Sequence, residues 1–340
     1  MAPASGPYHF IKEIHIGGLP STDYLTMDSE NHRLYVSHGT SVTVVDVDKG
    51  EIIGDISGNL TGIHGIAIVN KLGMGYISNG GGNNIAIFDL KTLKITKTVP
   101  TGNNPDWIFY EPGQGEVYAF NGRSNTATVI NAQTGDVTAT ITLPGKPESA
   151  TSDPAAGRVY DNIEDKAEVA VIDTKTHTVV ATWPNAPAAG ASGQAIDLAK
   201  HHLILGCDDT MGLMDSATGK LLSTLKAGAG IDSAAFDPGT GYAFVPCGQA
   251  ASTTIAKIDG DKLTLVQTLP TATGAKTMAL DPVTHNIYMA CVKYQAAAPA
   301  PAAASASGTG RGGRPPRPAA VADSFRILVY GMDAAPEAAK

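Results

Sequence analysis

Short apolar runs alternate with polar turns along almost the whole chain. The runs hold about five to eight residues, the usual length of a β-strand, as in GYISN ending at Asn79 and VAVID ending at Asp173. No amphipathic helix of convincing length is apparent. The pattern therefore predicts an all-β protein.

Two landmarks in this pattern recur about every 42 residues. The first is the residue that ends one apolar run, and the second is the polar residue that closes the next run. The first landmark falls at His38, Asn79, Asn121, Asn162, Cys207, Cys247 and Cys291, and the second at Asp46, Asp89, Asn131, Asp173, Asp215 and Asp259. Because two independent landmarks keep one period, the chain is interpreted as a tandem repeat.

Each repeat contains four predicted strands. Turn-forming residues such as DPAAGR from Asp153 join the first strand to the second, because Asp caps a turn, Pro fixes φ and Gly accepts a positive φ. A further strand after the second landmark completes the unit. Four antiparallel strands in about 42 residues make one blade of a β-propeller. The seven repeats thus predict a single seven-bladed β-propeller over residues 8–333.

The last repeat lacks a fourth strand and carries an insertion. Residues 8–16, YHFIKEIHI, alternate like the other fourth strands, and we expect them to pair in the last blade and close the ring. Closure would remove the exposed sheet edges that invite aggregation. Residues 295–324 are rich in Ala, Pro and Gly and are expected to form a disordered insertion, and residues 334–340 a disordered tail. The arginines of the insertion either face solvent or contact an acidic partner.

The segments YISN (76–79) and VAVID (169–173) carry the clearest repeat signature. They resemble the repeats of the YVTN family of seven-bladed β-propellers, the group that includes the bacterial YncE proteins. The resemblance implies the propeller fold and export to the periplasm or the cell surface. The chain opens with MAPASGP, which lacks the charged and apolar regions of a signal peptide, so we expect a mature exported form and leave a cytoplasmic location open.

The composition narrows the possible functions. A formal net charge of −8 argues against a general nucleic-acid binder, because neutralising phosphates requires a basic surface. No run of about eighteen apolar residues occurs, so we expect no membrane span. Motifs for a nucleophile elbow, a phosphate loop or a CxxC pair are absent from the sequence. We expect a monomer whose three cysteines are free and buried.

Propeller geometry predicts which residues gather at one mouth of the central channel. They are the residues that open each innermost strand and those that follow the first landmark. The candidate ligand-binding residues are Tyr24, Asn79, Asp106, Trp107, Asn121, Arg123, Asn162, Glu164, Asp208, Asp232 and Lys276. The repeated Asn is replaced by His in the first blade and by Cys in the last three, so any shared role of that Asn is confined to the second, third and fourth blades.

Two histidines fall at this mouth in neighbouring blades. His38 and His64 are predicted to lie near Asp106 and Glu148, and the four are candidate ligands for a divalent metal ion, the cofactor that we consider. His64, His38 and Glu148 are also candidate catalytic acids or bases. The simpler interpretation is that polar residues occupy the loop ends of every propeller and that each histidine bonds a loop carbonyl.

Three functions remain open at this point. The first is an exported binding module that holds a small polar ligand, a metal ion or a protein partner at the mouth. The second is a metal-assisted hydrolase or lyase, similar to a lactonase, that uses the same mouth. The third is an interaction scaffold without a small-molecule site.

Overall fold

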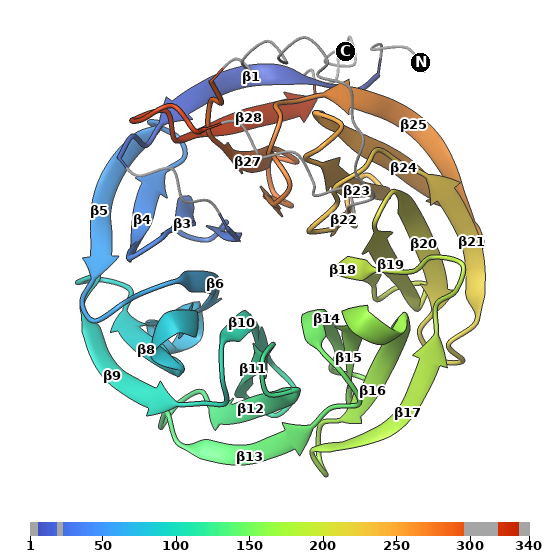
Figure 1. Cartoon of the computed structure of the whole chain (residues 1–340), viewed down its shortest axis with the longest axis horizontal. Coiled ribbons are helices and arrows are strands. Elements are labelled where there is room, and N and C mark those ends of the chain that lie inside the picture. The colour runs from blue at the N-terminus through green and yellow to red at the C-terminus, as the bar shows by residue number, and fades with distance from the viewer. Residues whose placement is uncertain (1–5, 19–22, 296–318, 333–340) are drawn as a thin grey trace, which may run out of the picture.

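The computed structural model describes residues 6–18, 23–295 and 319–332. Within these ranges, seven four-stranded sheets stand around a common axis like the blades of a propeller (Figure 1). In six of the sheets the strands run in chain order from the axis to the rim, and the remaining sheet takes its rim strand from the N-terminal part of the chain. The predicted all-β, seven-bladed architecture with four antiparallel strands per blade is confirmed.

The blades are numbered in chain order. Blade 1 contains β2 (Leu25–Asp28), β3 (Arg33–His38), β4 (Ser41–Asp46) and β5 (Glu51–Ser57); blade 2 contains β6 (Ile63–Val69), β7 (Met74–Asn79), β8 (Asn84–Asp89) and β9 (Ile95–Pro100); blade 3 contains β10 (Pro105–Glu111), β11 (Glu116–Asn121), β12 (Thr126–Asn131) and β13 (Val137–Thr142); blade 4 contains β14 (Pro147–Asp153), β15 (Arg158–Ile163), β16 (Glu168–Asp173) and β17 (Thr178–Pro184).

The last three blades follow the same plan. Blade 5 contains β18 (Ala191–Asp197), β19 (His202–Cys207), β20 (Thr210–Asp215) and β21 (Leu221–Lys226); blade 6 contains β22 (Ala235–Asp237), β23 (Tyr242–Cys247), β24 (Ser252–Asp259) and β25 (Lys262–Pro270); blade 7 contains β26 (Met278–Leu280), β27 (Ile287–Cys291), β28 (Arg326–Met332) and β1 (Tyr8–His15). Three short 3-10 turns, η1 (Asn70–Leu72), η2 (Gly80–Gly82) and η3 (Glu164–Lys166), join strands of blades 2 and 4.

The hydrophobic core lies between neighbouring blades. Tyr76 and Ile85 of blade 2, for example, share one buried cluster with Val117 and Ala119 of blade 3. Side chains on a strand point alternately to the two faces of its sheet, so a middle strand such as β11, in which every residue is buried, contacts both neighbouring blades. Each blade therefore needs two neighbours to cover its apolar faces.

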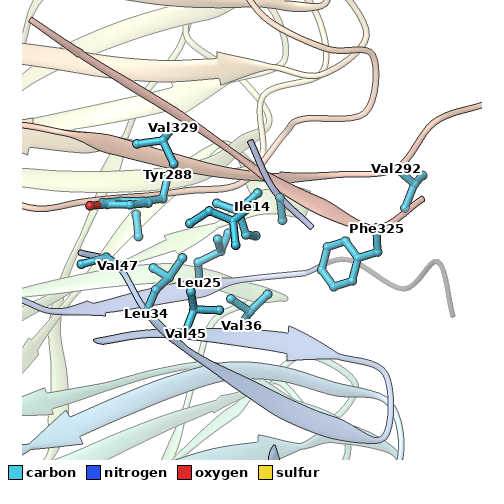
Figure 2. Close-up of a cluster of buried hydrophobic side chains, with 13 residues drawn as sticks. Ile14, Leu25, Leu34, Val36, Val45, Val47, Tyr288, Val292, Phe325 and Val329 are labelled. Atoms are coloured by element: carbon cyan, nitrogen blue, oxygen red, sulfur yellow. The ribbon is translucent and has the colours of Figure 1, made fainter. Parts of the chain in front are cut away.

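Strand β1 supplies the last blade with its rim strand and closes the ring. It pairs antiparallel with β28 along nearly its whole length. Ile14 of β1 packs with Leu34 of blade 1 and Val329 of blade 7 in the buried cluster shown in Figure 2. On the other side, the main chain of Tyr8 exchanges two hydrogen bonds of 3.0 and 2.8 Å with the side chain of Gln267 in blade 6. The predicted closure by residues 8–16 is confirmed, with the strand ending at His15.

The predicted insertion separates β27 from β28. Of residues 295–324, residues 296–318 lie outside the described part of the chain, as does the predicted tail, 334–340. The described ends of the insertion meet: the amide of Gln295 donates to the carbonyl of Ala319 at 2.8 Å, and that of Val321 to Lys293 at 2.7 Å. These bonds extend the hairpin beyond β27 before the chain departs from it.

The register of blade 4 differs by one residue from the predicted one. Asn79, at the end of β7, pairs with Ile63 at the start of β6, and the residue in the same place in blade 4 is Ile163, which pairs with Pro147. Asn162 is therefore not the counterpart of Asn79. Because side chains alternate between the two faces of a strand, a shift of one residue turns Asn162 to the opposite face.

Asn162 instead links blades 4 and 5. It is fully buried. Its Nδ2 donates to the carbonyl of Gly193 at 3.1 Å, and its Oδ1 accepts a hydrogen bond from Nε2 of Gln194 at 2.7 Å. Its polar atoms are thus engaged in packing one blade against the next.

The sequence predicts no membrane span and three free, buried cysteines. None of the helices in them is long and apolar enough to cross a membrane. Cys207, Cys247 and Cys291 are buried and form no disulfide, as expected.

Deletion of residues 8–16 should lower the melting temperature by about 10 °C or more, because it removes the β1–β28 ladder and the buried side chains of Tyr8 and Ile14. Ile14→Ala alone should cost about 2–5 kcal/mol of unfolding free energy. Phe10→Ala, at a half-exposed position of the same strand, is the matched control. Circular dichroism melts measure both effects, and an unchanged melt for the deletion would rule out closure by β1.

Asn162→Ala should reduce the unfolding free energy by about 1–3 kcal/mol, because it leaves the buried partners in Gly193 and Gln194 without hydrogen bonds. Arg123→Ala, on an exposed turn, should change it by less than about 0.5 kcal/mol. Urea denaturation of the two variants provides the comparison. Equal stabilities would contradict a structural role for Asn162.

Candidate functional site

A β-bulge opens the innermost strand of blades 2 to 5. In each of these blades the ladder between the first two strands shifts just after the first residue of the inner strand. His64, Asp106, Glu148 and Ser192 occupy that place. A bulge leaves a residue out of the ladder and redirects its side chain, which is why bulges recur beside functional sites.

The corresponding positions in the other three blades precede the inner strand. Together the seven positions form what we call the mouth ring: Asp23, His64, Asp106, Glu148, Ser192, Asp232 and Lys276. Four of them lie close enough together to act on one side chain: besides burial, the charges of Asp23, Asp106, Glu148 and Asp232 all raise the pKa of Tyr24. Every member of the ring is polar, although each belongs to a different blade.

Hydroxyl groups fix the main chain of the ring. For five of its members, the carbonyl oxygen accepts a hydrogen bond from a Ser or Thr of the preceding blade. The pairs are Ser37 with His64 (2.7 Å), Ser78 with Asp106 (2.5 Å), Ser149 with Ser192 (2.7 Å), Ser233 with Lys276 (3.5 Å) and Thr277 with Asp23 (2.7 Å). These bonds tie each ring position to its neighbouring blade and so preorganise the mouth.

Lysines neutralise one half of the mouth. Lys276 forms a very short ion pair with Asp232. Lys146, two residues before Glu148, lies between the carboxylates of Glu148 and Glu164, the latter at 2.5 Å. Burial and the charge of Asp106 raise the pKa of Glu148 above its usual range, while Lys146 opposes the shift. The carboxylates of blades 4 and 6 are therefore paired with cations.

The other half of the mouth holds a histidine between two carboxylates. Nδ1 of His64 lies 2.6 Å from Oδ2 of Asp23 and 3.6 Å from Oδ1 of Asp106. The side chain of Asn104 lies close to the imidazole and also favours its protonated form. Burial lowers the pKa of His64, but the hydrogen bond to Asp23 and the charges of both carboxylates outweigh it and raise that pKa to about 9. At neutral pH His64 thus carries a proton.

Burial has the opposite effect on the neighbouring acids. It raises the pKa of Asp106 to about 6, against the charge of His64. Asp161, close to Glu148, is fully buried, and neither of its carboxyl oxygens has a hydrogen-bond partner of ordinary geometry among the described residues. Burial and the charge of Glu148 raise the pKa of Asp161 well above its usual range, so burial favours the neutral form of this side chain.

Two aromatic side chains pack beside the ring. Tyr24 and Trp107 meet edge to face with their ring centroids 4.9 Å apart, although they come from blades 1 and 3. The intervening blade contributes Gly65, where an added Cβ would lie 2.9 Å from Cγ2 of Ile108. Nε1 of Trp107 donates to the carbonyl of Ala150 at 2.8 Å. Trp107 thus packs blades together, and Tyr24 is almost completely buried.

A cavity of about 310 Å³ opens on the lysine-paired half of the mouth, among blades 4, 5 and 6. Its polar lining comes from Glu164, Ser192, Asp208, Asp209, Asp232 and Gln249. Gly190 and Gly230, with φ of +67° and +81°, also line it. A Cβ on Gly190 would lie 2.7 Å from Oδ1 of Asp208, and one on Gly230 would lie 2.5 Å from Cγ of Gln249, so both turns depend on glycine.

The structure separates the predicted site residues into two groups. The mouth contains His64, Asp106, Glu148, Glu164, Asp208, Asp232 and Lys276, with Tyr24 and Trp107 packed beside them. The remaining candidates, His38, Asn79, Asn121, Arg123 and Asn162, have other surroundings.

Three of these remaining residues are held by contacts outside the mouth. His38 packs against Phe325, with ring centroids 4.7 Å apart, and is not part of the group formed by Asp23, His64 and Asp106. Asn79 is fully buried; its Oδ1 accepts from the amide of Thr61 at 2.8 Å. Asn121 is also fully buried and donates to two threonines. The repeated Asn thus holds turns together in these blades.

Asp23 occupies the same repeat position as His64 and Asp106, and the sequence pattern already places it at the opening of the first inner strand. Lys146 and Asn104 were not predicted, although the structure places both at the mouth. Lys146 lies two residues before a ring position, within reach of it through its long side chain. Asn104 has no repeat signature and was not predictable.

Comparisons with known proteins show the fold. No family model and no curated protein matches this chain. Similar solved structures include hydrazine synthase of Kuenenia stuttgartiensis (16% identity, TM-score 0.71, 83% of this chain and 96% of that chain) and a chain of the mitotic checkpoint complex (14%, 0.71, 84% and 88%). U3-55K is another (12%, 0.74, 94% and 98%). Identities this low establish a shared propeller fold and no shared ligand.

Proposed function

We propose that this protein is an exported binding module of the YVTN type that holds a small polar ligand at the mouth of its propeller. The observation that carries the proposal is the cavity of about 310 Å³ beside the mouth ring, whose polar lining consists mainly of side-chain oxygens. Small-molecule sites are typically concave and orient their ligand with fixed polar groups. The lining of this cavity is mainly polar, which suits a polar ligand.

The charges indicate the class of ligand. Among the acidic residues of the cavity, Glu164, Asp209 and Asp232 are paired with lysines. Asp208 has no such ion pair among the described residues and faces the cavity across Gly190. A ligand with an amine or several hydroxyl groups would donate to Asp208, Gln249 and Ser192. A charge-assisted hydrogen bond of this kind contributes about 1.5–3 kcal/mol.

The alternative of a metal-assisted hydrolase or lyase takes support from the group Asp23, His64 and Asp106. His64 is protonated at neutral pH in this arrangement, so it would not act there as a general base. Assays of a lactone panel distinguish the two functions, because a binding module leaves every lactone intact.

The cavity does not bear on export, on YVTN membership or on a protein partner, and each of these has its own support. Export and YVTN membership are supported by the repeat resemblance, and fractionation of the source cells would reveal an exported protein outside the cytoplasm. A protein partner or a pure scaffold role is supported only by the propeller fold. That fold is shared with a chain of the mitotic checkpoint complex, but the identity of 14% is too low to transfer a partner.

A thermal-shift screen of amines, amino acids, amino sugars and polyols, carried out with a chelator present, should find a ligand that raises the melting temperature. At a concentration of 100 times Kd the stabilisation is about 2.7 kcal/mol, or about 5 °C. Asp208→Asn should then weaken binding by about tenfold or more in calorimetry.

The matched control is Asp48→Asn, an exposed carboxylate on the opposite face. It should leave the affinity unchanged. Equal affinities of wild type and Asp208→Asn for the best ligand would place binding elsewhere, and a screen without any shift would refute the small-ligand proposal.

A further inference from the structure

Three donor groups from consecutive blades meet on the half of the mouth that faces away from the cavity. One ligand atom each of Asp23, His64 and Asp106 lies within 4.8 Å of the other two. Their side chains are 24%, 23% and 19% exposed, so the group is partly buried yet reachable from solvent. We infer that these three residues form a binding site for a divalent transition-metal ion such as Zn²⁺.

One of the two donor distances at His64 lies in the range that such an ion sets, and the other is shorter. Zinc binds imidazole nitrogen at about 2.0–2.1 Å and carboxylate oxygen at about 2.0–2.2 Å, so two donors to one ion lie about 3–4.4 Å apart. Nδ1 of His64 is 2.6 Å from Asp23 and 3.6 Å from Asp106. The first distance is that of a hydrogen bond, so the carboxylate of Asp23 would move outward when an ion binds, whereas Asp106 already lies at a suitable separation.

The charge balance also favours a cation. Within the described residues, no Lys or Arg forms an ion pair with Asp23 or Asp106, in contrast to Glu148 and Asp232 in the same ring. The carboxylates of Asp23 and Asp106 both face His64, and two adjacent carboxylates repel each other. A divalent ion between them would offset both negative charges.

The site is held in place before any ion arrives. The main-chain carbonyls of all three residues accept hydroxyl hydrogen bonds from the preceding blade, at 2.5–2.7 Å. Asn104 lies beside the imidazole, where a supporting residue commonly orients a metal-binding histidine. Gly80 makes room for the ring, since a Cβ there would lie 2.7 Å from Nε2 of His64.

Three protein ligands leave the ion at least one open coordination position. That position is available to water or to a donor atom of a molecule entering the mouth. The metal site uses blades 1 to 3, whereas the proposed ligand cavity lies among blades 4 to 6. The metal site is therefore separate from the proposed ligand cavity, and either can exist without the other.

Calorimetry with Zn²⁺ and elemental analysis after gel filtration should show one ion per chain. His64→Gln, Asp23→Asn and Asp106→Asn should each weaken binding by more than about tenfold, and Asn104→Ala by about tenfold. Two matched controls should retain wild-type affinity: His38→Gln, which alters a histidine in the adjacent blade, and Asp208→Asn, which alters the cavity alone.

A measurement on the wild type guards against variants that fail to fold. Zn²⁺ should shift the imidazole resonances of His64 in NMR spectra of the wild type and leave those of His38 unchanged. Absence of stoichiometric zinc, unshifted resonances of His64, or equal affinities of wild type and the three ligand variants would each overturn the site. Loss of zinc in His64→Gln with amine binding retained would separate this site from the ligand cavity.

Discussion

The pairing of β1 with β28 is the contact on which the rest of the structure depends. Each blade covers its apolar faces with two neighbours, so an open chain of blades would leave two faces and two sheet edges exposed. Pairing β1 with β28 joins the ends and buries Ile14 between blades 7 and 1 (Figure 2). Closure also completes the mouth, because Thr277 of blade 7 then fixes the main chain of Asp23 in blade 1.

The mouth concentrates charge at some cost in stability. Burial raises the pKa of Asp106 to about 6, which means that its charged form is less stable there than in water. Lys146 and Lys276 offset this cost on one half of the mouth, and His64 does so on the other. The large cores between blades allow such a cluster to persist, since they supply most of the folding free energy.

Much of this arrangement is predictable from the chain. A constant period assigns Asp106, Glu148 and Asp232 to equivalent places, and turn residues reveal which ends of the strands share a face. The blade count and ring closure follow from the same pattern, because a strand missing at one end was present at the other. The period predicts these features because each repeat places its backbone in the same way.

The direction of individual side chains and their partners are harder to predict from the sequence. A shift of one residue was enough to turn Asn162 from the mouth to the interface of blades 4 and 5. The sequence marks that shift only through the spacing, because Ile163 and not Asn162 follows Asn121 by 42 residues. His38 packs on Phe325, a residue far along the chain whose approach depends on closure of the ring. The partners of long side chains such as Lys146 depend on the bulges, which leave no clear trace in the sequence.

Crystals grown with Co²⁺ would test most directly whether the mouth ring binds ligands through its converging donors. An anomalous difference map should contain one strong peak bounded by Asp23, His64 and Asp106. A map without a peak there, or with peaks only at carboxylates on the opposite face, would contradict the assignment of this half of the mouth as a metal site.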